Sequence, residues 1–264
     1  MLLKIMREKT PDHVAVVFDP PGPTRRHREF KEYKAHRPPM PRDLVPQIPY
    51  IHTLVRAFRI PVFVQEGQEA DDVIATLTRI ARDAGLEVVI VTGDKDILQL
   101  VGPGITVYDT LKEMTYGPAD VQARFGVLPD RVVEVMGLMG DASDNIPGVP
   151  GIGEKTAQAL IKEYGSVEEV LAHAGEIKRP KLRQSLLDHA ALARLSRELA
   201  VLRSDVPLGA FLSGGIDSST VTGVLTEVAV PVLGTESNYW KNFFKFQYLK
   251  TVAPQVIVSL LARV

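Results

Sequence analysis

Residues 87–94 have the sequence EVVIVTGD, a short β-branched apolar run that stops at a glycine and an aspartate. Such a run predicts a buried strand whose carboxyl end carries the aspartate. Three similar runs predict further strands, at residues 13–18, 60–64 and 105–108. Amphipathic helical patterns at 47–58 and 69–84 lie between them. This β-α-β-α order predicts an α/β fold with a parallel sheet covered by helices on both faces.

The second half of the chain predicts helices without strands. The expected helices lie at residues 118–125, 129–139, 154–164, 167–172 and 181–202. We therefore expect three parts: an α/β core at 1–117, a helical region at 118–203, and a tail of different character at 204–264. Within the core, the Pro-, Arg- and Lys-rich stretch 20–41 predicts an exposed basic loop or loose helix.

Composition excludes several classes of protein. The 264 residues include no cysteine, so disulfides and thiolate metal sites are excluded. The apolar stretch 252–264 is shorter than a bilayer span. We expect a monomeric cytoplasmic protein with no membrane partner. The net charge is −1, yet residues 24–37 hold six Lys or Arg against two acidic residues. A local basic stretch of this kind favours phosphate binding.

Acidic residues collect where the predicted strands end or helices begin. The candidate metal ligands are Asp19, Glu69, Asp71, Asp72, Asp94, Asp96, Asp141 and Asp144. Any one of them has an ordinary alternative, because aspartate caps helices and acids in a first turn complement the helix dipole. As a set, they provide the hard oxygen ligands that Mg²⁺ or Mn²⁺ prefers. Two such ions about 4 Å apart support phosphodiester hydrolysis.

A glycine-rich segment, GVPGIGEKTA at 148–157, precedes the predicted helix 154–164. Glycines permit a tight hairpin, and backbone N–H groups at a helix start bind phosphate. The candidate DNA-binding residues here are Gly148, Gly151, Gly153, Lys155 and Thr156. The alternative is an ordinary interhelical turn.

Four segments together resemble the 5′-3′ exonuclease domain of bacterial DNA polymerase I, a member of the flap endonuclease family. They are VVFDPPGPTRRHREFKEYKAHRPPMP (16–41), EGQEADDVIATL (66–77), VVIVTGDKDILQLV (88–101) and LMGDASDNIPGVPGIGEKTAQALI (138–161). The resemblance covers residues 1 to about 206. It implies a PIN-like core, a helix-hairpin-helix, two metal ions on the eight carboxylates, and K⁺ at the helix-hairpin-helix.

The resemblance also assigns the basic stretch to an arch through which a single 5′ strand passes. Arg26 and Lys34 are then catalytic candidates that steer the scissile phosphate, and Tyr33 and Arg37 are DNA-binding candidates. The implied activity is 5′-3′ exonuclease and 5′-flap endonuclease cleavage in replication and repair. The implied partner is DNA with a free 5′ end, nick or flap, and relatives carry a polymerase domain.

Two departures from the family pattern keep alternatives open. The family opens with a central strand that ends in a metal-binding aspartate, and Met1 falls after it. We therefore expect two unpaired central strand edges, which favours a catalytically dead DNA-binding fragment as an alternative. In the tail, residues 203–225 resemble the pyrophosphate loop of asparagine synthetase, with Ser213, Gly214, Gly215, Asp217, Ser218 and Ser219 as its candidates. An ATP-dependent fragment of that family is the second alternative.

Overall fold

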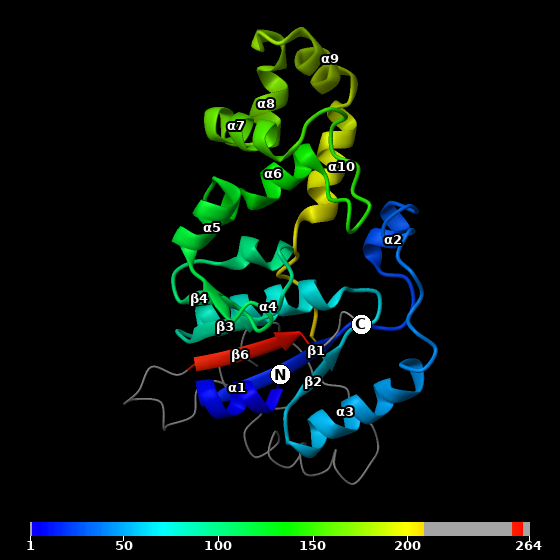
Figure 1. The fold of residues 1–264 in the computed structure, drawn as a ribbon, viewed down its shortest axis with the longest axis vertical. Coiled ribbons are helices and arrows are strands. Elements are labelled where there is room, and N and C mark those ends of the chain that lie inside the picture. Colours follow the sequence, from blue (N-terminus) through cyan, green and yellow to red (C-terminus); the bar gives the residue numbers. More distant parts are fainter. Residues whose placement is uncertain (1, 209–254, 261–264) are drawn as a thin grey trace.

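The computed structural model describes residues 2–208 and 255–260. Its centre is a six-stranded sheet in the order β2-β1-β6-β3-β4-β5 (Figure 1). The strands are β1 His13–Phe18, β2 Val62–Val64, β3 Glu87–Val91, β4 Ile105–Asp109, β5 Met114–Tyr116 and β6 Gln255–Leu260. All neighbours pair in parallel except β4 and β5, which are antiparallel. The predicted α/β fold with a parallel sheet is confirmed, and β5 is an edge strand that the sequence analysis did not predict.

Strand β6 lies between β1 and β3, in the middle of the sheet (Figure 1). It runs parallel to both, with Ile257 opposite Val14 on one side and Val89 on the other. The expectation of two unpaired central edges is therefore wrong for the described part of the chain. A segment from the carboxyl-terminal tail provides the backbone hydrogen bonds that the two edges require.

The two faces of the sheet follow from side-chain alternation along β1. Val16 and Phe18 pack with Val55 and Ile60 in one cluster, whereas Val17 packs in the main core with Ile74. Period-two alternation places neighbouring side chains on opposite faces. Helices α1 (Leu2–Lys9) and α3 (Ile48–Ala57) cover one face. Helix α4 (Ala70–Asp83) covers the other, on the side of the helical region (Figure 1).

Helix α4 starts at the carboxyl edge of the sheet and is the element that most directly positions the site. The Asp19 carboxylate, one residue beyond β1, accepts a 2.8 Å hydrogen bond from the Ala70 backbone N–H. This contact satisfies one of the free amides of the first turn. The helix ends where Gly85 adopts a φ of +80°, a conformation that glycine adopts without a steric penalty. Its buried side chains span residues 70–81, so α4 is held on most of its circumference.

The remaining helices form a region stacked above α4 in Figure 1. Their bounds are α5 Pro118–Phe125, α6 Val132–Met139, α7 Glu154–Tyr164, α8 Val167–Ala172, α9 Pro180–Asp188 and α10 Ala190–Ala200. Short helices are α2 Arg25–Glu29 and the 3-10 turns at Val45–Gln47, Asp96–Leu100, Pro129–Arg131 and Ala174–Glu176. No helix of the described residues is long and apolar enough to cross a bilayer.

The helix predicted at 181–202 is wrong in one respect, because it divides at His189 into α9 and α10. His189 has a φ of −119°, outside the helical region, and its Nδ1 lies 2.9 Å from the Ser185 carbonyl oxygen. The break sends α10 across α6, where Gly137 faces Arg197. A Cβ on Gly137 would lie 2.8 Å from the Arg197 Cβ, so glycine permits this close helix contact.

Candidate metal centre and nucleic-acid interface

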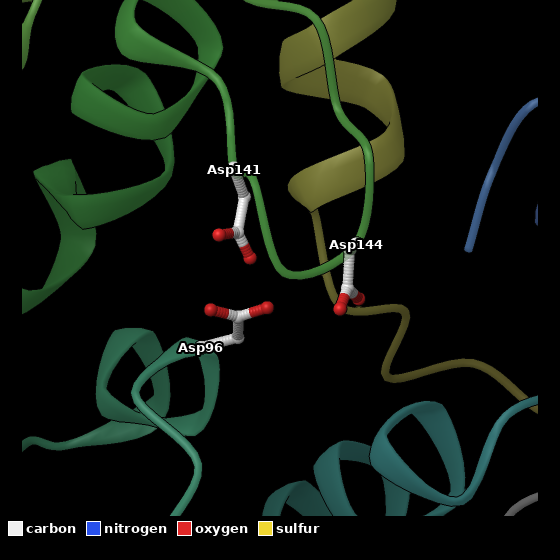
Figure 2. Close-up of side chains that lie close together, drawn as sticks. All are labelled: Asp96, Asp141 and Asp144. Atoms are coloured by element: carbon white, nitrogen blue, oxygen red, sulfur yellow. The ribbon is translucent and has the colours of Figure 1, made fainter. Parts of the chain in front are cut away.

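Three buried carboxylates meet above the carboxyl edge of the sheet. Asp96 begins the 3-10 turn that follows β3, and Asp141 and Asp144 lie in the loop after α6. One ligand atom from each lies within 4.8 Å of the others. Figure 2 shows the three side chains pointing toward a shared space from these two elements. The carboxyl edge of a parallel sheet is where α/β proteins place their ligands.

The geometry of loop 140–148 follows from its backbone. Asp141 and Ile146 exchange two backbone hydrogen bonds of 2.9 and 2.8 Å, which closes a tight turn and turns both aspartates inward. Gly140 and Gly148 have φ values of +74° and +64° and lie against each other. A Cβ on Gly148 would lie 2.4 Å from the Gly140 nitrogen, so both positions require glycine.

The electrostatics of Asp96 indicate a site suited to a cation. Burial, followed by the charges of Asp94, Asp141 and Asp144, raises the pKa of Asp96 to about 8. Within the described part of the chain, its buried Oδ1 accepts no hydrogen bond. A buried carboxylate oxygen that faces two further carboxylates is stabilised by a hard divalent cation. The residues therefore fit the metal centre that the sequence predicted at this position.

Three of the eight predicted ligands lie together in this cluster. Asp94 stands beside it, and its Oδ1 accepts the Asp96 N–H at 2.9 Å. Asp71 is buried in the first turn of α4, and Asp19 receives the Ala70 amide. Among the described residues, the other five predicted ligands lie outside the group of Asp96, Asp141 and Asp144; they are Asp19, Glu69, Asp71, Asp72 and Asp94. Whether they bind a second ion remains a prediction.

Cations of the basic stretch contact the other side of the site. Lys34 Nζ lies 2.7 Å from Glu69 Oε1 and 3.6 Å from Asp144 Oδ2, and Arg37 pairs with the Asp144 carboxylate. Burial opposes ionisation of Glu69, but Lys34 and Arg26 outweigh it and hold its pKa below the usual value. The Lys34 backbone N–H also donates to the Asp144 backbone carbonyl oxygen at 2.9 Å, which joins the basic stretch to loop 140–148. The basic stretch therefore lies directly against the carboxylates.

Tyr33 is enclosed within the site. Its side chain is 3% exposed, and its hydroxyl donates to Glu69 Oε2 at 2.9 Å and lies 3.0 Å from Asp144 Oδ2. Burial, with the charges of Glu69 and Asp144, raises its pKa, so the hydroxyl stays protonated. The DNA-binding role that the resemblance implied for Tyr33 requires exposure that the side chain lacks here.

Arg26 and Asp72 form a pair beneath the site, and each is 1% exposed. Arg26 donates to Asp72 Oδ2 and Oδ1 at 2.7 and 2.9 Å, and to Glu69 Oε2 at 3.0 Å. The resemblance implied that Arg26 lies at the scissile phosphate and that Asp72 binds a metal. The contacts instead direct both side chains toward each other.

The glycine-rich segment precedes α7, as the sequence predicts. Gly151, Gly153 and Lys155 are exposed, and Thr156 is partly buried. Gly148 differs from them because it is buried, and its N–H donates to the Ser196 hydroxyl at 2.9 Å. The exposed hairpin provides backbone amides and one lysine to a ligand, while Gly148 joins the hairpin to α10.

The pyrophosphate-loop candidates at 213–219 lie outside the described residues. Segment 199–206 extends from the end of α10 along α4, and its contacts with α4 were not predicted from the sequence. Thr76 and Arg79 bond to it, through Val206 N–H and the Ser204 carbonyl oxygen. Residues 72, 76 and 79 are spaced four and three positions apart, so these polar side chains share one face of α4, and this spacing was a usable signal.

A buried carboxylate cluster at the edge of a parallel sheet, faced by basic side chains, is the kind of site that metal-dependent phosphoryl-transfer enzymes use. The family model described as 5′-3′ exonuclease, N-terminal resolvase-like domain, matches residues 1–126. The model described as 5′-3′ exonuclease, C-terminal SAM fold, matches residues 127–215. The chain therefore belongs to the 5′-3′ exonuclease family. A third model, asparagine synthase, matches residues 184–256.

Known relatives agree with this membership. DNA polymerase I of Bacillus caldotenax is 47% identical over 212 residues, which are 79% of this chain and 24% of that protein. The chain spans between a fifth and a quarter of the curated relatives it matches.

Two structures of a phage T5 nuclease share the fold. The T5 5′-exonuclease, described as binding divalent metal ions (zinc), has a TM-score of 0.65 and 21% identity, covering 75% of this chain and 78% of its own. A T5 flap endonuclease complex with DNA and metal ions has a TM-score of 0.64 and 20% identity, with coverage of 76% and 78%.

Proposed function

We propose that this chain is a metal-dependent 5′ nuclease that hydrolyses phosphodiesters in DNA with a free 5′ end, nick or flap. The observation that carries the proposal is the convergence of Asp96, Asp141 and Asp144, within 4.8 Å of one another and beside the Lys34 and Arg37 cations. Carboxylates hold a divalent cation, and adjacent lysine and arginine offset the charge of a phosphate. The adjacency of the two groups supports metal-dependent phosphoryl transfer, and the family supports a nuclease as the particular enzyme.

A bound divalent cation would supply Lewis-acid activation of water and of the phosphate oxygen. Asp96, Asp141 and Asp144 would hold it, and Lys95, 2.6 Å from Asp141 Oδ1, would orient that carboxylate. Lys34 would contact the scissile phosphate once a substrate replaces Glu69 as its partner. We favour Mg²⁺ or Mn²⁺, because the ligands are all carboxylate oxygens, and two ions if Asp19, Asp71 and Asp94 complete a second site.

DNA would be held by its backbone rather than read by sequence. The hairpin at 148–153 and the start of α7 present amides and Lys155 to a duplex phosphate, with K⁺ as a candidate bridging ion. The T5 flap endonuclease of the same fold is described in a complex with DNA and metal ions. We further propose a monomer divided near residues 117 and 203, with a polymerase domain in relatives.

The test is cleavage of a labelled 5′-flap duplex by the purified chain, with Mg²⁺ or with EDTA. We expect cleavage only with the metal. Asp96→Asn and Asp141→Asn should each reduce the rate by about a hundredfold or more, since they remove direct ligands. Asp130→Asn is the matched control, because Asp130 is exposed and pairs only with Arg131 at 3.5 Å among the contacts of the described residues.

The alternatives predict different outcomes. A protein that folds and retards the flap duplex in a gel but does not cut it would be a DNA-binding fragment, and the nuclease proposal would be wrong. Cleavage that survives EDTA, or that Asp130→Asn abolishes as fully as Asp96→Asn does, would also contradict the proposal. Protection of the tail by ATP, without DNA binding, would favour the asparagine synthetase-like alternative.

A further inference from the structure

The guanidinium of Arg26 joins three parts of the molecule at a single buried point. Arg26 lies on α2, at the start of the basic stretch. Its Nε donates to the Leu199 carbonyl oxygen at 2.8 Å, and its Nη2 donates to the Val201 carbonyl oxygen at 2.7 Å. The remaining contacts go to Asp72 and Glu69, on the first turn of α4 and just before it. The basic stretch, the α/β core and the helical region therefore converge on one cation.

These contacts use the full donor capacity of the side chain. A guanidinium has five N–H groups. The two to Asp72, one to Glu69, and one each to Leu199 and Val201 account for all of them. Burial by itself would lower the pKa of Arg26, but Asp72 and Glu69 outweigh it and raise the pKa, so the group stays charged. An arginine that is 1% exposed with every donor engaged has none left for a phosphate.

Asp72 is engaged in the same way. Besides Arg26, its Oδ1 accepts the Arg203 backbone N–H at 2.9 Å. Segment 199–206 continues along α4 through two further contacts, Arg79 Nε to the Ser204 oxygen at 2.7 Å and Val206 N–H to Thr76 Oγ1 at 3.1 Å. Gln99, next to the metal centre, holds the same segment through the Ala200 oxygen and the Leu202 N–H, each at 3.1 Å. Asp72 thus anchors a segment of chain rather than facing the carboxylate cluster.

We propose that Arg26 and Asp72 are positioning residues that touch neither DNA nor metal, and that they orient Glu69 by fixing segment 199–206 and α2 against α4. This role rests on the proposed nuclease function and departs from the roles that the sequence assigned to both residues. Glu69 connects the pair to the reaction, because one of its oxygens takes Arg26 and the other takes Lys34 at 2.7 Å. Displacement of Arg26 and Asp72 would move Glu69, and Lys34 would move with it.

The experiment measures four variants of the full chain: Asp72→Asn, Arg26→Gln, Arg26→Lys, and the double variant that combines Arg26→Gln and Asp72→Asn. Each single change should lower the melting temperature and reduce flap cleavage by about tenfold, as loss of a supporting contact does. The Mg²⁺ concentration for half-maximal cleavage should stay within about twofold of the unmodified value, whereas Asp96→Asn should raise it by about tenfold or more. The double variant replaces an ion pair with a neutral amide pair, so it should be closer to the unmodified protein than either single variant is.

Several outcomes would overturn the assignment. A tenfold rise in half-maximal Mg²⁺ for Asp72→Asn would make Asp72 a metal ligand. Strictly additive effects in the double variant would mean that the two residues act independently. If the Asp72 variants do not fold, Arg26→Lys decides, because lysine keeps the charge and loses the planar fork. An unchanged melting temperature with a raised KM for DNA would then make Arg26 a phosphate contact.

Failure of the proposed function is distinguishable from failure of this inference. If the unmodified chain cuts no DNA, the nuclease proposal fails, but melting temperatures in EDTA still test the coupling between Arg26 and Asp72. Non-additive melting shifts would support the buried junction in a protein without nuclease activity. Additive shifts would contradict the junction in either case.

Discussion

At the scale of single residues, Gly140 and Gly148 determine whether Asp141 and Asp144 face Asp96. The two glycines lie in backbone contact at the ends of the loop that carries both aspartates. Gly151 offers a natural comparison three residues further on. It also has a positive φ, +79°, but a Cβ there would meet nothing within 4 Å. Comparing Gly148 with Gly151 therefore separates the cost of a left-handed backbone conformation from the cost of a steric clash.

We predict that Gly151→Ala destabilises the protein by about 1–2 kcal/mol, the cost of a left-handed conformation for an L-residue. Gly148→Ala should lose about 1–3 kcal/mol more, because its Cβ must displace the Gly140 backbone. Urea unfolding midpoints measure both changes. Gly148→Ala should also weaken metal-dependent cleavage, since loop 140–148 would open. Equal destabilisation by the two substitutions would show that the contact between Gly140 and Gly148 does not form.

At the scale of elements, β6 determines whether the sheet is continuous. Its neighbours β1 and β3 lead into Asp19 and Asp94. The spacing between these two strands therefore sets the distance between the two aspartates. A central parallel strand bonds to a neighbour on each side, and without one, both neighbours expose unpaired amides and carbonyls. The carboxyl-terminal strand therefore contributes to the site through the backbone of the sheet.

Proline at the centre of β6 tests this dependence. Ile257→Pro removes one N–H from a strand paired on both sides, and a carbonyl left unpaired costs about 1–3 kcal/mol before any ring clash. We expect a lower melting temperature and loss of cleavage in proportion. Ile257→Thr is the control, because threonine keeps the N–H and the β-branched shape. Identical melting curves for the proline variant and the unmodified chain would mean that β6 does not occupy the central position in solution.

At the scale of the whole molecule, a net charge of −1 does not attract DNA by itself. The proposed DNA binding must therefore depend on local cations, and the candidates fall into two groups. Lys34 and Arg37 lie at the carboxylates, and Lys155 lies on the exposed hairpin at the start of α7. Two separated contacts with the backbone favour recognition of DNA shape over recognition of sequence.

We predict that Lys155→Ala weakens binding of a duplex with a 5′ flap and reduces the slope of log affinity against log salt by about 1, as loss of one phosphate contact does. The cleavage rate at saturating DNA should change little. Arg82→Ala is the control, since Arg82 is an exposed cation at the far end of α4 from the site. Gel retardation in EDTA across a salt series measures both. If Lys155→Ala leaves the salt slope unchanged, the hairpin does not contact the DNA phosphates.

The division between sequence and tertiary structure follows the range of the interactions. Strand runs, helix periods and glycine turns depend on neighbours within a few residues, so the α/β core, most helices and the hairpin before α7 could be predicted. The candidate carboxylates were also visible, because acids at strand ends are a local pattern. Which of them meet was not visible, since Asp96 and Asp141 come from separate elements that only folding brings together.

The positions of Arg26 and β6 depend on contacts between distant parts of the chain. Arg26 lies in a basic stretch that predicts exposure, yet it is buried against the Val201 carbonyl oxygen, 175 residues away along the chain. Strand β6 pairs with His13–Phe18, which no local pattern links to residues 255–260. Local sequence patterns were sufficient to predict the fold class and the set of chemical groups at the site. The structure determined which carboxylates lie together, which side chains hold the chain in place, and which strand completes the sheet, because these depend on distances between residues far apart in sequence.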